Sequence, residues 1–365
     1  MLRIAYLVQL DLSLESGVIK KVLSQMRMWD ACSHEVRLFV MAPNAREWSG
    51  LANVSKTTAV YGSSLLGRLK ASRWLEQMIR AWNPDVVYMR YGTYHPPWRR
   101  LCRLFPTVVE INTNETTEYR LVLSRLKYAY HRLTGRIILN NAAGLVFVTH
   151  ELSLKHACYS AVRKVIPNGM ELSSVQHRDR EPKNNSRKQL VFMGSPGCPW
   201  HGADMIPPLA RELPDCDFHV VGYSAEDIGK NLPGNLEVHG HLSRQQYDTI
   251  LRSSDVAIGS LALNRIGLQE ACPLKTREYL AYGLPVITGY DDSDFPDNTP
   301  YILRLNMVEH DWHEMGRQIR EFVTEWTDRC VPRQAIGHID AGIKERNRLL
   351  FMQEVIREWN EGSPV

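Results

Sequence analysis

The sequence predicts an α/β protein with two doubly wound domains, each a parallel β-sheet covered by helices on both faces. Short apolar runs typical of buried strands alternate with helical patterns, and this alternation favours parallel sheets. A polar, highly charged stretch at residues 171–188 separates two such series and is expected to be a linker. The 365 residues suffice for two domains. We expect these domains at residues 1–170 and 189–335, followed by residues 336–365 as a helical tail.

The first series of elements begins with a strand at residues 3–9, reading RIAYLVQ. A turn around Gly17 then leads into a helix at residues 18–31. Pro167-Asn168-Gly169 is a strong turn signal that closes the series. Between these limits, further strands are expected at residues 34–41, 85–90, 107–112, 145–149 and 162–166.

The second series resumes the alternation directly after the linker. It continues to the C-terminal helix expected within residues 336–361. The expected strands are residues 189–194, 217–222, 236–240, 256–260 and 284–289, and the expected helices are residues 203–213, 243–253 and 274–282.

Composition excludes several classes of protein. The seven cysteines are scattered, with no Cys-x-x-Cys and no paired histidines, which argues against a zinc site or a disulfide framework and fits a reducing compartment. No apolar run reaches the roughly 18 to 20 residues that a membrane span needs, and the first strand begins at once after Met1. We expect a cytoplasmic protein that carries no bound metal.

Charge is distributed unevenly along the chain. Residues 1–169 hold 23 basic and 11 acidic residues, a net charge of +12, whereas the remainder has a net charge of −8. The densest basic segment, residues 120–136, interleaves basic and aromatic side chains on a helical pattern, and nothing in it resembles a nucleic-acid recognition motif. One interpretation is a basic amphipathic helix at the inner membrane leaflet, and the other is a solvated helix face. The membrane interpretation rests on Arg120, Arg125, Lys127, Arg132 and Arg136.

The most informative segment is residues 267–287, which place Glu270 and Glu278 eight positions apart. Pro273 suits the first turn of a helix, so Glu270 is expected at the mouth of that helix and Glu278 about two turns inside. The backbone N–H groups of Cys272, Leu274 and Lys275 would point into this mouth. A helix N-terminus of this kind binds phosphate. A phosphate pocket with an acidic group on each side suits a nucleotide-sugar.

This Glu-x7-Glu pattern, followed by an apolar helix and a Gly-x-Pro-Val-Ile strand, resembles the family 4 glycosyltransferases. The variant with Pro-Leu-Lys before Glu-Tyr-Leu-Ala is similar to bacterial exopolysaccharide-assembly members. The resemblance is most specific here and extends more weakly over nearly the whole chain. It implies the GT-B fold, in which two Rossmann-like doubly wound domains face each other across a cleft. It also implies that the last helix packs back on the first domain.

In the first domain the resemblance points to three residues. The segment SGVIKKV resembles the family's glycine motif, so Gly17 is expected near the donor, although a turn glycine would look the same. Asn112 stands where the family usually has an acceptor-side histidine, which implies that its amide binds a sugar near the reaction centre. Arg90 ends a strand and is a candidate contact for an acceptor anion, with a structural salt bridge as the alternative.

In the second domain the segment GSPGCPWHGAD resembles the motif in which an arginine and a lysine clamp the donor phosphates. Here Ser195 and His201 occupy those two places, so the clamp is altered. Lys275 and Arg277, with His201 as a partial cation, are then expected to offset the phosphate charge. The remaining donor-binding positions are expected at strand ends: Gly194, Gly222, His241 and Leu242.

The resemblance implies transfer of a hexose with retention at the anomeric carbon. Glu278 would bind the ribose hydroxyls, while Glu270 would bind the donor sugar and stabilise its positive charge. The helix N-terminus and Lys275 would stabilise the leaving diphosphate without a metal or other cofactor. The resemblance favours a UDP-sugar such as UDP-glucose as donor, with a GDP-sugar as the next choice, and the expected acceptor is a saccharide or a polyprenyl-linked oligosaccharide. Peripheral association at the inner membrane face is a further expectation, and no nucleic-acid partner is expected.

Other functions remain open from the sequence. A UDP-sugar 2-epimerase would share the nucleotide site but needs acid and base residues that the sequence does not reveal. A phosphorylase would need a cofactor lysine and a longer chain. A non-catalytic nucleotide-sugar or polysaccharide-binding protein would explain the altered clamp. An NAD enzyme is disfavoured because no G-x-G-x-x-G follows a strand.

Overall fold

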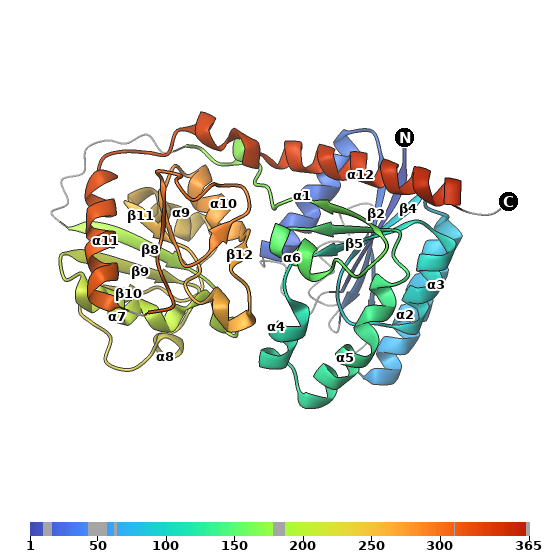
Figure 1. The fold of residues 1–365 in the computed structure, drawn as a ribbon, viewed down its shortest axis with the longest axis horizontal. Coiled ribbons are helices and arrows are strands. Elements are labelled where there is room, and N and C mark those ends of the chain that lie inside the picture. Colours follow the sequence, from blue (N-terminus) through green and yellow to red (C-terminus); the bar gives the residue numbers. More distant parts are fainter. Residues whose placement is uncertain (10–16, 43–56, 62–63, 178–186, 310, 363–365) are drawn as a thin grey trace. The chain divides into compact units, whose positions relative to one another are not determined.

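The protein divides into two compact units, described here from a computed structural model (Figure 1). Unit 1 consists of residues 1–166 and 342–365, and unit 2 consists of residues 167–341. Both are α/β units with a parallel sheet, as the sequence predicted. The structure describes residues 1–9, 17–42, 57–61, 64–177, 187–309 and 311–362.

The sheet of unit 1 has seven parallel strands in the order β3-β2-β1-β4-β5-β6-β7. The order reverses between β1 and β4, and the carboxyl ends of strands at such a switch point form the usual ligand site of this architecture. The strands are β1 (Arg3–Gln9), β2 (Glu35–Ala42), β3 (Thr57–Tyr61), β4 (Val86–Arg90), β5 (Thr107–Ile111), β6 (Gly144–Phe147) and β7 (Val162–Val165).

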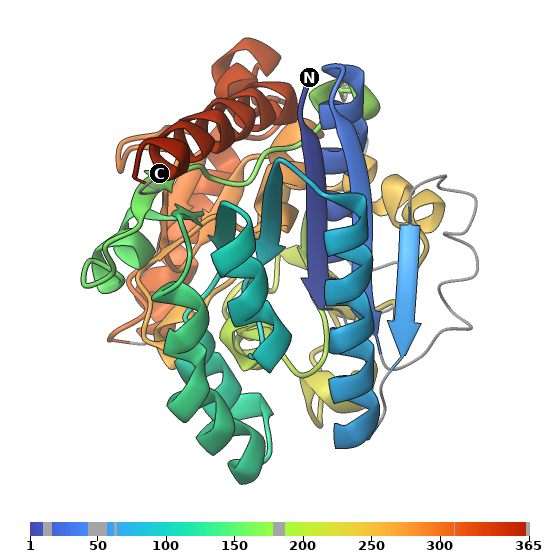
Figure 2. The same cartoon turned by 90° about the vertical axis from the view of Figure 1, so that its right-hand side faces the viewer.

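Alternating side chains of this sheet form two apolar layers. Tyr6 and Tyr88 belong to the layer under α1 (Gly17–Ala31) and α12 (Ala341–Gly362), which adds Phe351 and Met352. The opposite face carries Phe39, whose ring lies 6.1 Å from that of Trp82. Figure 2 shows unit 1 from the side of the helices that cover this second face. The other helices of the unit are α2 (Leu65–Trp82), α3 (Pro96–Leu104), α4 (Glu115–Val122), α5 (Arg125–Leu139) and α6 (His150–Lys155).

The sheet of unit 2 repeats this arrangement with six parallel strands in the order β10-β9-β8-β11-β13-β15. Its order reverses between β8 and β11. Helices α7 and α11 pack against each other, and in Figure 1 α9 and α10 lie on the other side of the sheet. The strands are β8 (Lys188–Met193), β9 (Cys216–Val221), β10 (Leu236–Val238), β11 (Val256–Ile258), β13 (Val286–Thr288) and β15 (Ile302–Arg304), and β12 (Glu270–Ala271) pairs with β14 (Asp291–Asp292) apart from the sheet.

The helices of unit 2 are short, and several turns are 3₁₀. The α-helices are α7 (Ile206–Glu212), α8 (Ala225–Ile228), α9 (Arg244–Ser253), α10 (Leu274–Ala281) and α11 (Trp312–Glu325). The 3₁₀ turns are η2 (Leu172–Ser174), η3 (Pro199–His201), η4 (Ala203–Met205), η5 (Leu263–Ile266) and η6 (Arg333–Ile339). The predicted helix at residues 203–213 is therefore a 3₁₀ turn followed by α7.

Two further expectations need correction. The basic segment 120–136 is not one helix, because α4 ends at Val122 and α5 begins at Arg125, with Ser124 as its N-cap. The C-terminal helix expected from residue 336 begins later, at Ala341, after a 3₁₀ turn. Part of the expected linker, residues 178–186, lies outside the described residues.

Candidate functional site

Glycines mark the carboxyl ends of neighbouring strands in unit 2. Gly194 follows β8 and Gly222 follows β9, as the sequence predicted for strand ends. Gly222 has a φ of +94°, and a Cβ on it would lie 2.1 Å from the main-chain oxygen of Gly194. Only glycine fits this approach. The Gly222 N–H also donates to the Gly240 oxygen at 2.7 Å, so main-chain atoms of the ends of β8, β9 and β10 converge.

The loop after β8 places His201 against this end of the sheet. His201 Nδ1 lies 3.2 Å from the Tyr223 hydroxyl and accepts from the Ser195 N–H at 3.4 Å. Burial, with a smaller contribution from Lys275, lowers the pKa of His201 to about 2. The imidazole is therefore neutral, and the expectation that it acts as a partial cation is wrong. Its contacts with Ser195 and Tyr223 suit a neutral imidazole that forms hydrogen bonds.

Lys275 lies in the first turn of α10, and its side chain reaches the end of β8. Its Nζ donates to the Met193 oxygen at 3.0 Å and lies 4.6 Å from the centre of the Phe192 ring. Burial lowers the pKa of this amine to about 7. A lysine with this pKa gains a full charge when an anion binds beside it. Lys275 thus lies beside Gly194, at the switch point between β8 and β11.

Arg277, the other expected phosphate cation, is engaged elsewhere. Its fully buried guanidinium bonds Asp292 at 2.6 and 2.7 Å and Asp294 at 3.0 Å. Its Nε donates to the Asn168 oxygen at 3.1 Å. A buried cation held by two carboxylates is a structural ion pair, and withdrawing it would leave those carboxylates uncompensated. The expectation that Arg277 offsets phosphate charge is therefore wrong.

Helix α10 begins as the sequence predicted, with Pro273 as its N-cap and Leu274 and Lys275 in its first turn. Cys272 lies ahead of this turn and is buried. Its thiol accepts from the Asn168 N–H at 3.0 Å, and its carbonyl accepts from Asn168 Nδ2 at 2.6 Å. The Pro-Asn-Gly turn therefore anchors the chain that leads into the helix.

The two glutamates of the motif have different surroundings. Glu278, in the second turn of α10, accepts a hydrogen bond from the Tyr247 hydroxyl at 3.0 Å. Glu270 lies before the helix in strand β12, where it pairs in register with Asp291 of β14. Both are half-buried. Tyr247 is a site neighbour that the sequence did not reveal, since only the packing of α9 brings it to Glu278.

The turn after β10 carries the other expected donor-binding positions. His241 is exposed and Leu242 is half-buried. They precede Ser243, which forms a capping box with Gln246 at the start of α9. This cap fixes the path of the main chain directly after Gly240.

In unit 1 Asn112 directly follows β5, and Lys21 of α1 contacts it. Lys21, on α1, donates to Asn112 Oδ1 at 3.0 Å and to Glu110 Oε1 at 2.9 Å. Asn112 Nδ2 is buried and has no hydrogen-bond partner among the residues that the structure describes. A buried donor of this kind calls for an acceptor. The amide is thus oriented by Lys21, with its N–H groups available to a ligand.

A buried charge cluster supports this end of the sheet. Glu110 is also paired with Arg348 of α12 at 3.2 Å, and Arg348 pairs with Glu345. Burial acts to raise the pKa of Glu110, but the nearby charges of Lys21 and Arg348 outweigh burial and lower this pKa to about 2. Burial lowers the pKa of Lys21 to about 8. Lys21 lies four residues after Gly17, within the segment that resembles the family's glycine motif. Its partner Glu110 is 89 residues away, so the sequence could not reveal this contact.

Arg90 ends β4 beside a second acidic group. It is half-buried and pairs in register with Glu110. Glu115, at the start of α4, is 6% exposed, and burial together with Glu118 raises its pKa to about 8, against a smaller opposing effect of Arg90. Gly17, by contrast, is exposed as the first residue of α1, and residues 10–16 directly before it lie outside the described residues.

The comparisons identify this arrangement. Residues 16–169 match the glycosyl transferase 4-like domain family. Unit 1 thus carries a match to this family, and the solved structures described below share the chain's GT-B fold. This match agrees with the resemblance to the family 4 glycosyltransferases, whereas the link to exopolysaccharide assembly stays a prediction. No curated protein matches significantly.

Solved structures share its fold at low sequence identity. A glycosyltransferase from Rickettsia africae has 12% identity and a TM-score of 0.69, over 97% of this chain and 99% of that chain. Anabaena HepE in complex with UDP-glucose has 13% identity and a TM-score of 0.68, over 97% and 100% of the two chains. Sucrose-phosphate synthase from Thermosynechococcus elongatus has 14% identity and a TM-score of 0.67, over 99% and 98%.

The basic side chains of α4 and α5 in unit 1 are exposed together with apolar ones. Arg120 lies on α4, and Arg125, Lys127, Arg132 and Arg136 lie on α5, where all are exposed. We call these five residues the basic surface. Leu126 and Leu133, on α5 as well, are 84% and 81% exposed. None of the helices in the described part of the chain is long and apolar enough to cross a membrane.

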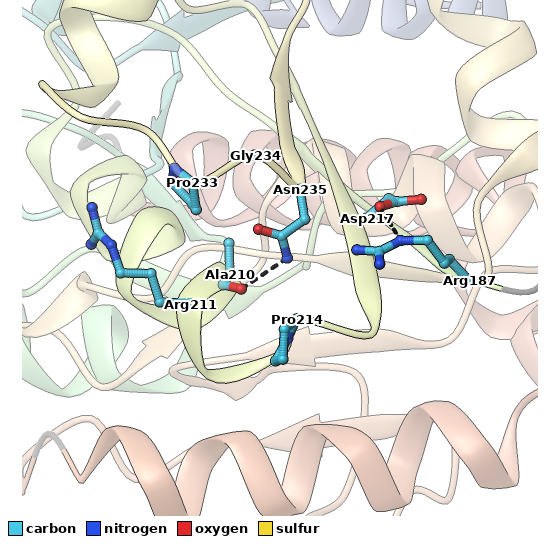
Figure 3. A pocket seen from close by; sticks show the side chains of 8 residues that line it. All are labelled: Arg187, Ala210, Arg211, Pro214, Asp217, Pro233, Gly234 and Asn235. Atoms are coloured by element: carbon cyan, nitrogen blue, oxygen red, sulfur yellow. Dashed lines mark hydrogen bonds and ion pairs between the residues drawn. The ribbon is translucent and has the colours of Figure 1, made fainter.

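Unit 2 has a pocket of about 550 Å³ at the opposite end of its strands from Gly194 and Gly222 (Figure 3). It is lined by Arg187 and Asp217, which form an ion pair at 2.7 Å, and by Asn235. These residues lie at the amino ends of β8, β9 and β10, whereas ligands of doubly wound sheets bind at the carboxyl ends. Asn235 Nδ2 donates to three main-chain oxygens, so its role is structural.

Proposed function

We propose that this protein is a glycosyltransferase that moves a hexose from a UDP-sugar to a saccharide or lipid-linked acceptor in polysaccharide assembly, with retention at the anomeric carbon. The observation that carries the donor assignment is the position of Lys275. Its amine lies in the first turn of α10, beside Gly194 and the end of β8. Helix N–H groups, a lysine and closely packed glycine main chain are together what a sugar diphosphate requires.

The roles of the two glutamates follow from their places. Glu278, held by Tyr247, would accept hydrogen bonds from the ribose hydroxyls. Glu270, in the strand before α10, would bind hydroxyls of the transferred sugar and stabilise its developing positive charge. The turn at His241 and Leu242 would hold the base through main-chain atoms. In this scheme Lys275 and the helix N-terminus stabilise the leaving diphosphate, and the reaction needs no metal ion.

Unit 1 supplies candidate groups for the acceptor. Asn112 offers a buried amide N–H without a partner among the described residues, and Arg90 offers a half-buried guanidinium at the neighbouring strand end. A sugar hydroxyl suits the first and an acceptor anion the second. A UDP donor is favoured because the similar HepE structure contains UDP-glucose and an α-glucosyltransferase of the same fold contains UDP.

A non-catalytic nucleotide-sugar-binding protein is the second candidate. It is favoured by the neutral His201 and the engaged Arg277, which leave Lys275 as the remaining cation of the predicted set. The two functions differ in turnover. Incubation with radiolabelled UDP-glucose and an extract of lipid-linked and soluble saccharides should give a labelled acceptor for the transferase, but only bound, unchanged donor for the binding protein.

The preference of the donor site for one nucleotide can be tested by thermal unfolding. UDP-, GDP-, ADP- and dTDP-sugars should be compared in thermal unfolding, because a ligand at a hundred times its dissociation constant stabilises by roughly 2.7 kcal/mol. UDP-sugars should give the largest increase in unfolding temperature. An equal response to all four would contradict a base-selective donor site.

A further inference from the structure

A cluster of two histidines and a glutamate lies on the sheet of unit 2, outside the proposed transfer site. His219 of β9 pairs in register with Glu237 of β10, so both side chains point to the same face. His239, two residues beyond Glu237, shares this face. The His219 and His239 side chains are only 17% and 18% exposed, whereas that of Glu237 is 67% exposed.

The spacing of the three side chains suits one cation. His219 Nδ1 lies 3.0 Å from His239 Nε2 and 3.6 Å from a Glu237 carboxylate oxygen. Two nitrogens bound to a tetrahedral zinc at about 2.0–2.1 Å each lie roughly 3.3 Å apart. One ligand atom from each residue lies within 4.8 Å of the others. The cluster therefore needs only small adjustments to hold an ion.

A second set of hydrogen bonds fixes which nitrogen of His219 is free to bind. Gln189 Nε2 donates to Asp217 Oδ2 at 3.0 Å and to the Arg187 oxygen at 3.2 Å, so both amide hydrogens are used. Gln189 Oε1, 2.7 Å from His219 Nε2, must then accept. The proton of His219 is thus on Nε2, and the Nδ1 lone pair faces His239 and Glu237. Metal-binding histidines are oriented by partners of this kind.

We propose that His219 Nδ1, His239 Nε2 and a Glu237 carboxylate oxygen form a zinc-binding site, completed by water. Two imidazoles and a carboxylate are ligands that Zn²⁺ accepts. The ion would tie the short edge strand β10 to β9, one residue before Gly240. Its role is to hold this strand and not to take part in transfer. This site could not be predicted from the sequence, because the histidines are twenty residues apart and only strand register brings them together.

The test is a zinc titration of chelator-treated protein in competition with a chromophoric chelator, after alkylation of the thiols. The wild-type protein should bind one equivalent of Zn²⁺, and zinc should raise its unfolding temperature. Glu237→Gln and His219→Gln should each weaken zinc binding at least tenfold. Gln189→Met, which removes the acceptor of His219 Nε2, should weaken it by roughly ten- to a hundredfold.

His313 provides a matched control. It is an exposed histidine of the same unit, with Glu212 at 3.7 Å, and lacks the second histidine. His313→Gln should bind zinc as the wild type does. Glu237 is exposed enough for its variant to fold, and UDP-sugar binding by the same sample checks this independently. The proposal is overturned if alkylated wild-type protein binds no zinc, or if Glu237→Gln and His313→Gln bind it equally.

Discussion

Lys275 Nζ donates a hydrogen bond to the main-chain oxygen of Met193 at 3.0 Å. This contact joins the first turn of α10 to the last residue of β8, next to the glycine pair Gly194 and Gly222. Burial holds the pKa of Lys275 near 7, so the amine is partly neutral before an anion arrives. A diphosphate bound here would restore its charge, and donor binding and protonation are therefore coupled.

The first prediction is a pH dependence of donor binding. Only protonated Lys275 attracts the diphosphate, so affinity for UDP-glucose should be highest below pH 7 and fall as the pH rises through it. We expect a loss of about tenfold between pH 6 and pH 8.5, measured by calorimetry. UDP-glucose is the suitable ligand because its diphosphate has no ionisation in this range.

Two substitutions at Lys275 check the cause. Lys275→Arg keeps a charge at every pH tested and should give a flatter profile, while Lys275→Gln should bind weakly throughout. A wild-type affinity independent of pH, or a Lys275→Gln affinity equal to that of the wild type, would remove Lys275 from the phosphate site.

The second prediction concerns Glu278. Glu278→Gln should weaken binding of free UDP and of UDP-glucose alike, because the proposed contact is to the ribose. Hydrogen bonds to a charged group contribute about 1.5–3 kcal/mol, or roughly ten- to a hundredfold in affinity. Tyr247→Phe removes only the hydroxyl that holds Glu278 and should have a smaller effect of the same kind. Unchanged UDP affinity in Glu278→Gln would refute the assignment.

Glu270 should behave differently, which is the third prediction. Its proposed contacts are to the transferred sugar, so Glu270→Gln should keep UDP affinity within about twofold while lowering kcat by roughly a hundredfold or more. Titration calorimetry with UDP and a radiolabel transfer assay measure the two effects. Equal losses of UDP binding and of turnover would mean that both glutamates serve one structural purpose.

Local signals in the sequence were strong enough to predict the framework of both sheets. Strand β1 has the predicted bounds, and α10 begins after Pro273 and is followed by Gly283 with a φ of +83°. Such elements depend on periodicity, proline and glycine, which are read within a few residues. The break between α4 and α5 was missed because neither proline nor glycine marks it.

The charged partners could not be predicted, because they are set by packing. Arg277 looks like a second phosphate cation in the sequence, but its carboxylate partners Asp292 and Asp294 come from a later segment that returns to α10. Lys21 likewise has its partner Glu110 on β5, 89 residues away. A single sequence shows that such side chains are charged but does not show which charge each one meets.

The fourth prediction is a pH dependence of stability caused by Glu115. Folded Glu115 keeps its proton up to about pH 8, whereas an unfolded glutamate loses it near pH 4.5. Between these values the folded state binds more protons, so this group's contribution to the free energy of unfolding falls as the pH rises. Glu115→Gln removes the ionisation and should stabilise the protein at pH 8.5, on the order of a few kcal/mol, but little at pH 5.

Urea unfolding of both proteins at the two pH values measures the effect. Glu358→Gln is the control, because Glu358 is an exposed residue of the same unit and its substitution should not raise stability selectively at pH 8.5. If Glu115→Gln gains no more at pH 8.5 than at pH 5, the buried carboxyl is not protonated in the folded protein.

The last prediction concerns the basic surface of α4 and α5. If it contacts a membrane, the protein should sediment with vesicles that contain anionic lipid and not with neutral ones. Each basic residue near such a surface contributes on the order of 1 kcal/mol, and salt should release the protein because the interaction is screened. Arg125→Glu, Lys127→Glu and Arg132→Glu together should abolish sedimentation. Arg99→Glu with Arg103→Glu, on α3, changes exposed basic residues of the same unit and should have a smaller effect.

The exposed side chains of Leu126 and Leu133 should add an apolar contribution to membrane binding. Leu126→Ser with Leu133→Ser should therefore weaken binding even at low salt, because their apolar surface would enter the interface. A wild-type protein that ignores anionic vesicles at low salt would favour a soluble saccharide as acceptor over a lipid-linked one.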